Sequence, residues 1–479
     1  MAKALLVIPP CAFLLDERVF PTLGVLKVAA AMQRADIDVD VVDCTGTIDP
    51  DRRFFDAVLD ADADWVGFTG TMAEMPWVAR MAEEVRALRP AARIVLGGPH
   101  VTLLASSAKR EQVPGRATRA LGQFKDHFDT LVLGDGERAV LRTLTRLPPA
   151  EVIDADDPKS PLYLKPESLT DAPWPDRDKI DIASYHYAID GHKTMSLIGQ
   201  LGCPFGCTFC GGRNSPFLRR VRVRSPERIV AEVEYLYARY AATGFFFLDD
   251  ELNVNRLFPE LLAELVKLQE RLGVDLAFRG LLKSELLTAE MATQMQAAGF
   301  RSVLVGFESG HPRILRNINK QATVDDNTRC VERLQAAGLS VKALMSLGHA
   351  GESEETIAAT RRWLLSVRPD DFDATVLTVY PGTPIYDEAQ PTATPGVYNY
   401  KAPGTNDMLY SRDVDQFTET PFYKGRPTAY QSFVWTEHLS AKDLVEARDD
   451  LEREVRSALK IPYPVDPVAQ QYEHSMGLR

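Results

Sequence analysis

Short apolar runs alternate with helical stretches over the first 145 residues, and this alternation limits the fold more than any other feature of the chain. Five buried strands are expected, at Ala4–Ile8, Val39–Val42, Trp65–Thr69, Arg93–Leu96 and Thr130–Leu133. Amphipathic helices are expected between them, at Leu23–Arg34, Arg52–Leu59 and Pro76–Leu88. Such alternation is typical of a parallel sheet covered by helices on both faces. Residues 1–147 are therefore predicted to form a doubly wound α/β domain, with its ligand at the carboxyl ends of the strands.

The same alternation resumes after a segment rich in Pro and Asp, residues 148–193, which is expected to be a linker. Six strands are expected beyond it, at Thr194–Gln200, Gly244–Asp249, Asp275–Arg279, Ser302–Phe307, Lys342–Leu347 and Asp373–Val379. Helices are expected at Pro226–Tyr240, Phe258–Leu272, Ala289–Ala298 and Val324–Ala337. Six β/α units indicate a partial (β/α)₆ barrel over residues 194–390, with its chemistry at the carboxyl ends of the strands.

The last part of the chain, residues 391–479, differs in character. Tyrosines are set among Pro, Thr and Gly, at Tyr398, Tyr400, Tyr410, Tyr423 and Tyr430, and one charged helix is expected at Ser440–Leu459. This C-terminal extension is predicted to be mostly irregular and helical. It could serve as a substrate lid or simply pack against the end of the barrel, and the sequence leaves both open.

Charge and composition exclude several kinds of partner. The net charge is −12 and the pI is near 5.3, which argues against a nucleic-acid partner. A basic stripe at Arg213, Arg219, Arg220, Arg222 and Arg224 is either close to an anionic cofactor or a solvated face. The apolar run at the start of the chain is too short for a signal sequence or a membrane span, so we expect a cytoplasmic protein with no membrane partner. A small-molecule substrate is favoured over a macromolecule.

Three of the six cysteines lie within eight positions, directly after the first expected barrel strand. Cys203, Cys207 and Cys210 follow a C-x₃-C-x₂-C spacing, with Gly206 allowing a tight backbone path. Three thiolates on one short loop can hold three corners of a four-iron cubane and leave the fourth iron open. Zinc is the alternative, but it needs a fourth Cys or His ligand, and none follows at a suitable distance.

This spacing, with Phe209 just before the last cysteine, resembles the radical S-adenosylmethionine (SAM) superfamily. Taken with the N-terminal domain, residues 1–390 resemble the cobalamin-dependent radical SAM enzymes. The resemblance implies a 4Fe-4S cluster on the three cysteines, SAM at the open iron and cobalamin on the N-terminal domain. It also implies an external one-electron reductant of the flavodoxin or ferredoxin type.

Motifs at the later strand ends extend the resemblance to SAM. It implies that SAM contacts Phe209, Asp249, Asp250, Glu251, Arg279, Glu308 and Ser309. Taken singly, the acidic residues could equally cap helices or form surface salt bridges. Leu347–Glu352 resembles the fifth-strand "GxPGE" loop, and Pro381–Tyr386 resembles the sixth-strand "PGTPxY" turn.

Glycine loops in the N-terminal domain resemble a cobalamin site. The residues implied are Leu23, Gly24, Thr69, Thr71, Met72, Gly97, Gly98, Pro99, His100, Gly134, Asp135, Gly136 and Glu137. No G-x-G-x-x-G follows the first strand, which argues against a dinucleotide. The D-x-H-x-x-G loop of other cobalamin proteins is also missing, so cobalamin is expected to bind without its own base or a histidine below cobalt.

The resemblance implies methylation of an unactivated carbon of a small metabolite, through a 5′-deoxyadenosyl radical and methylcobalamin. A radical cyclisation, ring contraction or rearrangement that uses cobalamin without methyl transfer is the alternative. A corrinoid or iron–sulfur carrier without catalytic activity is a more distant one. No stretch of residues 390–479 identifies the substrate.

Overall fold

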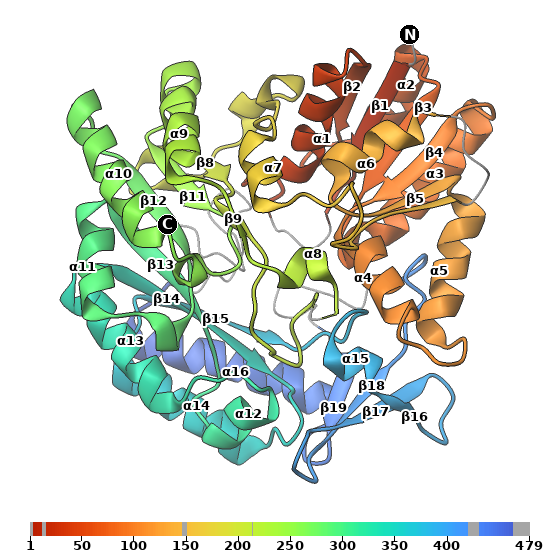
Figure 1. The fold of residues 1–479 in the computed structure, drawn as a ribbon. Coiled ribbons are helices and arrows are strands. Elements are labelled where there is room, and N and C mark those ends of the chain that lie inside the picture. The colour runs from red at the N-terminus through yellow and green to blue at the C-terminus, as the bar shows by residue number, and fades with distance from the viewer. Residues whose placement is uncertain (1–2, 12–15, 146–150, 213, 420–430, 463–479) are drawn as a thin grey trace.

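The computed structural model describes residues 3–11, 16–145, 151–212, 214–419 and 431–462. Two α/β units lie side by side, and the C-terminal extension runs beneath them (Figure 1). The N-terminal unit is red to orange, the barrel is green to cyan, and the extension is blue. Within the described residues, no helix combines the length and the apolar character needed to cross a membrane.

The N-terminal unit is built on a sheet of six parallel strands in the order β2-β1-β3-β4-β5-β6. Their bounds are β1 Lys3–Ile8, β2 Asp38–Asp43, β3 Trp65–Thr69, β4 Arg93–Gly97, β5 Thr130–Gly134 and β6 Glu151–Ala155. The five predicted strands are present. The sixth, β6, falls inside the segment expected to be a linker, and it pairs with β5 along its whole length. The sheet therefore continues past residue 147, where the domain was expected to end.

Helices cover both faces of this sheet, which accounts for the almost unbroken apolar character of its strands. The helices are α1 Leu23–Arg34, α2 Pro50–Ala61, α3 Met75–Leu88, α4 Pro99–Ala108, α5 Arg116–His127 and α6 Gly136–Thr143. Apolar residues of α1 and α6 form one core with the sheet, and those of α2 to α5 form another on the opposite face. The chain crosses from one face to the other between β1 and β3, so a ligand site is expected at the carboxyl ends of these strands.

The segment after β6 ties the two units together. Asp156 accepts hydrogen bonds from Ser215 Oγ and from the backbone N–H of Phe217, both at 2.7 Å. Arg177 is 1% exposed and donates to Glu232 at 3.2 Å and to the carbonyl of Ser196 at 2.7 Å. The segment also includes the short helix α7, Pro166–Asp171, and the 3₁₀ turns Arg177–Lys179 and Ile182–Ser184. Its polar side chains hold fixed contacts with the barrel.

The barrel sheet has the order β15-β14-β13-β12-β11-β8-β7, with six parallel strands and an antiparallel edge strand, β7. Its strands are β7 Ala188–Ile189, β8 His192–Leu197, β11 Gly244–Phe247, β12 Ala277–Leu282, β13 Phe300–Glu308, β14 Ser340–Leu347 and β15 Asp371–Val376. The helices on its outside are α9 Pro226–Tyr240, α10 Phe258–Leu272, α11 Ala289–Ala297, α12 Pro312–Asn317, α13 Val324–Ala336 and α14 Glu354–Val367. The predicted partial (β/α)₆ barrel is confirmed.

The cysteine loop is bracketed by a small hairpin of β9 Gln200–Leu201 and β10 Arg222–Val223, with α8 Pro216–Arg219 between them. Most of the basic stripe predicted here takes part in internal contacts. Arg222 pairs with Asp135 at 2.6 Å, and Arg224 pairs with Glu232 at 2.8 Å. Arg213 lies outside the described residues. The buried arginines are structural rather than a solvated face.

The C-terminal extension contains a sheet that the sequence did not lead us to expect. Four antiparallel strands, β16 Gln390–Pro391, β17 Val397–Lys401, β18 Met408–Arg412 and β19 Val434–Thr436, follow the short helix α15, Pro384–Asp387. The tyrosines of β17 alternate in sequence, which suits a strand with one buried face. The predicted charged helix is present as α16, Ala441–Leu459, which begins with a capping box of Ser440 and Asp443.

Helix α16 packs along the free edge of the barrel sheet. Glu452 accepts a hydrogen bond from the backbone N–H of Ala374 at 2.6 Å, and Arg448 donates to the carbonyl of Ala374 at 2.8 Å. Arg456 forms an ion pair with Asp371 at 3.0 Å. Side chains of α16 thus form hydrogen bonds with backbone groups of the edge strand β15.

Candidate functional site

Two cavities lie at the carboxyl edges of the two sheets. One opens above the barrel beside the cysteine loop, with a volume of about 250 Å³. The other lies in the N-terminal unit, with a volume of about 290 Å³. Both positions agree with the rule that ligands of parallel sheets bind where the strands end.

All three cysteines of the loop line the barrel cavity. Cys203 and Cys207 are buried and Cys210 is partly exposed. The loop is fixed from outside, because Thr208 donates its backbone N–H to the carbonyl of Ile318 at 2.9 Å and Asn319 Nδ2 donates to the carbonyl of Gly206 at 3.0 Å. A loop held in this way presents three thiols to one cavity, as a cubane requires.

A chain of hydrogen bonds starts from Lys320 and Glu308, which line the barrel cavity. Lys320 Nζ donates to Glu308 Oε1 at 3.0 Å, and Ser346 Oγ donates to Glu308 Oε2 at 2.9 Å. His349 Nε2 lies 2.6 Å from Ser346 Oγ. Because the single hydroxyl proton of Ser346 is directed to the carboxylate, the histidine donates its Nε2 proton to Ser346. The ring of His349 also meets that of Phe209 edge-on, with centroids 5.2 Å apart.

Glu308 reaches this chain through a strained backbone. Its φ is 65°, in the left-handed region that a side chain avoids at a cost of about 1 kcal/mol. The register of β13 against β14 also shifts between Gly306 and Glu308. Strain of this kind gathers where a side chain must be aimed at a ligand.

Burial and neighbouring charges shift the pKa values of three side chains in and beside the cavity. Burial works to lower the pKa of Lys320, but the charges of Glu308, Cys207 and Glu251 outweigh it, so the pKa is raised. Burial also raises the pKa of Glu251 to about 7, against the opposing effect of Lys320. Burial lowers the pKa of His349 to about 4, so the imidazole is neutral at pH 7.

Replacing Lys320 by methionine is expected to lower the free energy of unfolding by about 3 kcal/mol, because the partly buried Glu308 then loses its counter-charge. The double variant Lys320→Met/Glu308→Gln should recover most of this loss. Urea unfolding followed by circular dichroism measures the free energy of unfolding of the single and the double variant. Lys267→Met, which breaks an exposed pair with Glu264, is the control and should change stability by less than about 1 kcal/mol. Equal losses of unfolding free energy in Lys320→Met and Lys267→Met would contradict the prediction.

Three of the residues predicted to contact SAM line the barrel cavity: Phe209, Glu251 and Glu308. The other four do not. Asp249 accepts the backbone N–H of Gly199 at 2.7 Å, and Asp250 accepts that of Gly202 at 3.0 Å. These two carboxylates brace the segment that leads into the cysteine loop, and burial raises the pKa of Asp249 to about 8.

Arg279 and Ser309 also point elsewhere. Arg279 donates to the hydroxyl of Tyr187 inside the barrel, and Ser309 Oγ lies 3.1 Å from the hydroxyl of Thr360 on α14. Their predicted contact with SAM stays a prediction that the cavity does not support. Lys283, Lys320 and Phe205 line the cavity instead and were missed by sequence reasoning.

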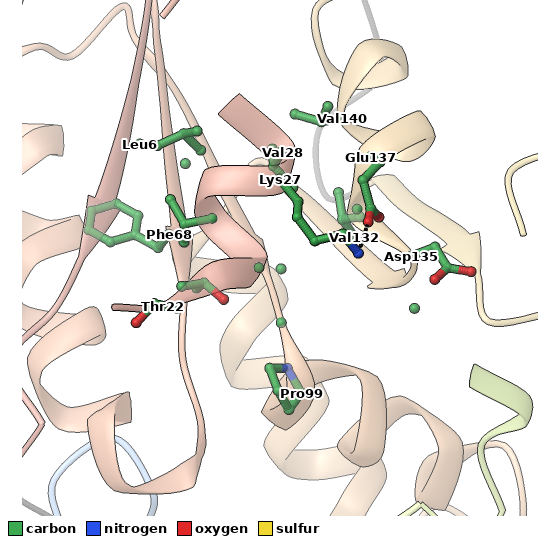
Figure 2. A pocket seen from close by; sticks show the side chains of 18 of the residues that line it. Leu6, Thr22, Lys27, Val28, Phe68, Pro99, Val132, Asp135, Glu137 and Val140 are labelled. Carbon is green, nitrogen blue, oxygen red and sulfur yellow. Dashed lines mark ion pairs between the residues drawn. The ribbon is translucent and has the colours of Figure 1, made fainter. Parts of the chain in front are cut away.

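The cavity of the N-terminal unit is lined by nine of the thirteen residues predicted to bind cobalamin. These are Gly24, Thr69, Gly97, Gly98, Pro99, Gly134, Asp135, Gly136 and Glu137. Figure 2 shows the cavity between α1, α6 and the sheet, with Leu6, Phe68 and Val132 on its apolar wall. Sequence reasoning missed Lys27, Trp65 and Gly67, which also line this cavity.

Two of the glycines that line this cavity pack closely against neighbouring segments. Gly98 has φ +99°, and an added Cβ would lie 2.5 Å from Thr69 Oγ1. Gly134 has φ +77°, and its Cβ would lie 2.6 Å from the backbone of Ala155. Only glycine fits both the dihedral angle and the close approach. A mostly apolar cavity lined in part by glycine loops suits the binding of a planar base with a nucleotide-like tail.

The acidic residues at the rim already have protein partners. Glu137 of α6 forms an ion pair with Lys27 of α1 (Figure 2). Asp135 pairs with Arg222 and accepts the backbone N–H of Leu164 at 2.8 Å. Any contact of these carboxylates with cobalamin would have to be shared with these partners.

Four predicted cobalamin residues lie off this cavity. Leu23, Thr71, Met72 and His100 are not among its lining residues. His100 is 3% exposed, and its ring lies against that of Phe124 with centroids 5.5 Å apart. Burial lowers the pKa of His100 to about 4. Absence of a histidine below cobalt stays a prediction, since part of the loop after β1, residues 12–15, lies outside the described residues.

The segment that carries the cysteines contributes to both cavities. Ile198 and Leu201, before Cys203, line the cavity of the N-terminal unit, and so does Phe217, seven residues after Cys210. The three cysteines between them in sequence line the barrel cavity.

Comparison with known proteins agrees with this geometry. Residues 17–132 match the family model of the B12 binding domain, and residues 197–364 match that of the radical SAM superfamily. The chain belongs to the cobalamin-dependent radical SAM family. This membership favours a 4Fe-4S cluster over zinc on Cys203, Cys207 and Cys210.

Relatives of this cobalamin-dependent radical SAM protein include an uncharacterised methyltransferase, PH0819, from Pyrococcus horikoshii. The two are 27% identical over 471 residues, which cover 96% of this chain and 99% of the relative. The anaerobic magnesium-protoporphyrin IX monomethyl ester cyclase of Rubrivivax gelatinosus is 25% identical over 340 residues, which cover 68% of this chain and 58% of the cyclase. The match thus spans little more than half of the cyclase.

Among solved structures, the radical SAM methyltransferase TsrM from Kitasatospora setae, with tryptophan and a SAM analogue bound, matches with a TM-score of 0.65. The sequences are 17% identical, and the match covers 99% of this chain and 94% of TsrM. At this identity the likeness concerns the fold. It extends through both units and into the C-terminal extension.

Proposed function

We propose that this protein is a cobalamin-dependent radical SAM C-methyltransferase acting on an unactivated carbon of a small metabolite. The observation that carries the proposal is that one segment of chain lines both cavities: residues before and after the cluster cysteines line the cobalamin cavity, and the cysteines line the other. A methyl donor and a radical source that are bound beside the same segment can both reach one substrate. Methyltransferases among the relatives, including the full-length match to PH0819, support the same activity.

When bound, the reduced cluster supplies the electron that splits SAM to a 5′-deoxyadenosyl radical, and cobalamin carries a methyl group. The residues of the chain place these groups and exclude water. We assign Cys203, Cys207 and Cys210 to the cluster, Glu251, Glu308 and Phe209 to the SAM pocket, and the glycine loops to cobalamin. Lys320 holds the carboxyl group of Glu308 in place, because the two side chains form an ion pair at 3.0 Å in a largely buried position.

The electron is proposed to come from a separate carrier of the flavodoxin or ferredoxin type. The described residues show only one cysteine cluster of the required spacing, so no second relay centre is assigned within them. The net charge of −12 argues against nucleic acid as a partner. No membrane partner is proposed.

Methyl transfer is tested with methyl-deuterated SAM, the reconstituted and reduced protein, and a metabolite extract. Mass spectrometry is expected to find a product that carries the deuterated methyl group, with S-adenosylhomocysteine and 5′-deoxyadenosine formed in comparable amounts. Each turnover needs one SAM as methyl donor and one as radical source, which fixes this ratio. A protein lacking the three cysteines serves as the control.

A second candidate is a cyclisation or rearrangement without methyl transfer, which the similarity to the magnesium-protoporphyrin cyclase favours. It predicts 5′-deoxyadenosine and a converted substrate, but neither S-adenosylhomocysteine nor deuterium in the product. That outcome would exclude methyl transfer.

A further inference from the structure

A single carboxylate lies at the junction of the cobalamin-binding unit, the cluster loop and the C-terminal extension. It belongs to Asp387, the last residue of α15, whose side chain is 3% exposed. In Figure 1, α15 lies just below α4 of the N-terminal unit. The segment Tyr380–Asp387, which includes the turn after the sixth barrel strand, connects these parts, and we call it the junction segment.

One face of the junction segment contacts the cobalamin-binding unit. Ser107 Oγ, on α4, donates to Asp387 Oδ1 at 2.5 Å and accepts the backbone N–H of Gly382 at 2.6 Å. Helix α4 begins at Pro99, inside the glycine loop that rims the cobalamin cavity. A hydrogen bond near the end of this helix therefore fixes an element that starts at the ligand.

Apolar and cationic contacts strengthen the same face. The ring of Tyr386 is buried in the core that α2 to α5 form with the N-terminal sheet. The guanidinium of Arg116 lies 3.5 Å from the centre of this ring and donates to the Tyr386 carbonyl at 2.6 Å. Arg110 adds only a weak, half-exposed contact, 3.9 Å from Asp387.

The other face contacts the segment that carries the cysteines. Asn214 Nδ2 donates to Asp387 Oδ2. Ile385 donates its backbone N–H to the carbonyl of Thr208 at 3.2 Å, and Gly211 donates its own to Tyr380 Oη at 3.0 Å. Thr208 and Gly211 are neighbours of Cys207 and Cys210 in sequence. The two oxygens of Asp387 are thus divided between the two cofactor-bearing parts.

We propose that Asp387 is a positioning residue that holds the cobalamin-binding unit at a fixed distance from the cluster loop. It touches neither cavity, since it lines neither of them. Its effect is geometric: a displacement of about 1 Å between reacting groups can cost as much as a hundredfold in rate. Asn at this position keeps the size of the side chain but has only one oxygen acceptor. If that oxygen accepts from Ser107, the NH₂ group of the new side chain faces the NH₂ group of Asn214. If it accepts from Asn214, the hydrogen bond from Ser107 is lost.

The test is the separation of two unpaired spins in the reconstituted protein. With the cobalt as cob(II)alamin and the cluster reduced, dipolar electron paramagnetic resonance measures the distance distribution between them. We expect a narrow distribution in the unmodified protein and a clearly broader one in Asp387→Asn, at equal iron and cobalamin content. Asp326→Asn, which breaks a helix-capping network of similar size within the barrel, is the control and should stay narrow.

A product readout accompanies the distance. In Asp387→Asn, methylated product per 5′-deoxyadenosine is expected to fall about tenfold or more, because radicals form without a correctly placed methyl donor. This ratio rests on the proposed methyl transfer, whereas the distance needs no substrate. If no protein gives methylated product, methyl transfer fails while the distance still decides the role of Asp387.

An unchanged, narrow distribution in Asp387→Asn would overturn the proposal. If that variant does not bind both cofactors, Ser107→Ala and Asn214→Ala are measured in its place, since each removes one of the two side-chain hydrogen bonds of Asp387. Broadening in either supports the role of the junction, and narrow distributions in both overturn it.

Discussion

Replacing Cys203, Cys207 and Cys210 together by alanine is expected to reduce bound iron from about four atoms per chain to background. All reductive cleavage of SAM should disappear with it. The physical reason is that these thiolates are the only protein ligands the proposed cluster has. Anaerobic reconstitution followed by iron and sulfide analysis measures the first effect, and chromatography of 5′-deoxyadenosine measures the second.

Cobalamin binding separates loss of the cluster from loss of the fold. The N-terminal unit has its own sheet and cores, so the triple variant should still bind cobalamin. Cys330→Ala is the matched control, because Cys330 is fully buried in α13 and far in sequence from the loop. Iron content equal to that of the unmodified protein in the triple variant would refute the assignment.

A phenylalanine at Gly97 is expected to weaken cobalamin binding by at least about a hundredfold, a change of about 2.7 kcal/mol. Gly97 lines the cavity, and a Cβ added there would meet nothing closer than Val132, at 3.7 Å. Its φ lies outside the left-handed region, so the backbone tolerates a side chain. The first carbon therefore fits, while the ring takes up volume that the ligand needs. Equilibrium dialysis against hydroxocobalamin measures the affinity.

Gly122→Phe controls for the general effect of a large side chain. Gly122 lies on α5, does not line the cavity, and has nothing within 4 Å of an added Cβ. This variant should bind cobalamin with unchanged affinity. If Gly97→Phe binds as tightly as Gly122→Phe, the cofactor lies elsewhere and the assignment of the glycine loops is wrong.

The repeated pattern of the sequence was sufficient to predict both sheets, because it depends on local periodicity and on burial from both sides. The sequence pattern did not locate the strand ends as accurately, and one such error changed the assignment of a site residue. The third barrel strand was expected to end at Arg279, but it continues to Leu282. Lys283, one residue further on, lines the cavity in place of Arg279. A shift of a few residues changed which cation was assigned.

Contacts between distant segments could not be predicted from single motifs. Glu308 was identified from its motif, but its partner Lys320 comes from a loop that carries no pattern of its own. Asp250 and Asp249 were assigned to SAM because acidic strand ends suit an amine, yet backbone N–H groups of residues 199 and 202 occupy them. Only the folded chain shows which carboxylates are already engaged.

The small sheet of the extension was missed for a different reason. Pro, Gly and Thr around Tyr398, Tyr400 and Tyr410 indicate breaks in regular structure, and they dominated the interpretation. In the structure these breaks are the turns of a meander, and the tyrosines occupy its strands β17 and β18. Short antiparallel strands leave a weaker pattern than parallel ones, since only one face is buried.

The position of α16 near the end of the sequence matters while the chain is being synthesised. A barrel of six strands has an open side, and exposed edge strands invite pairing with other chains. Side chains of Arg448, Glu452 and Arg456 occupy that side along β15, which ends at residue 376. During synthesis the edge therefore emerges from the ribosome well before the helix that covers it. Until α16 has been translated, the edge of the nascent barrel lacks this cover and can pair with other chains.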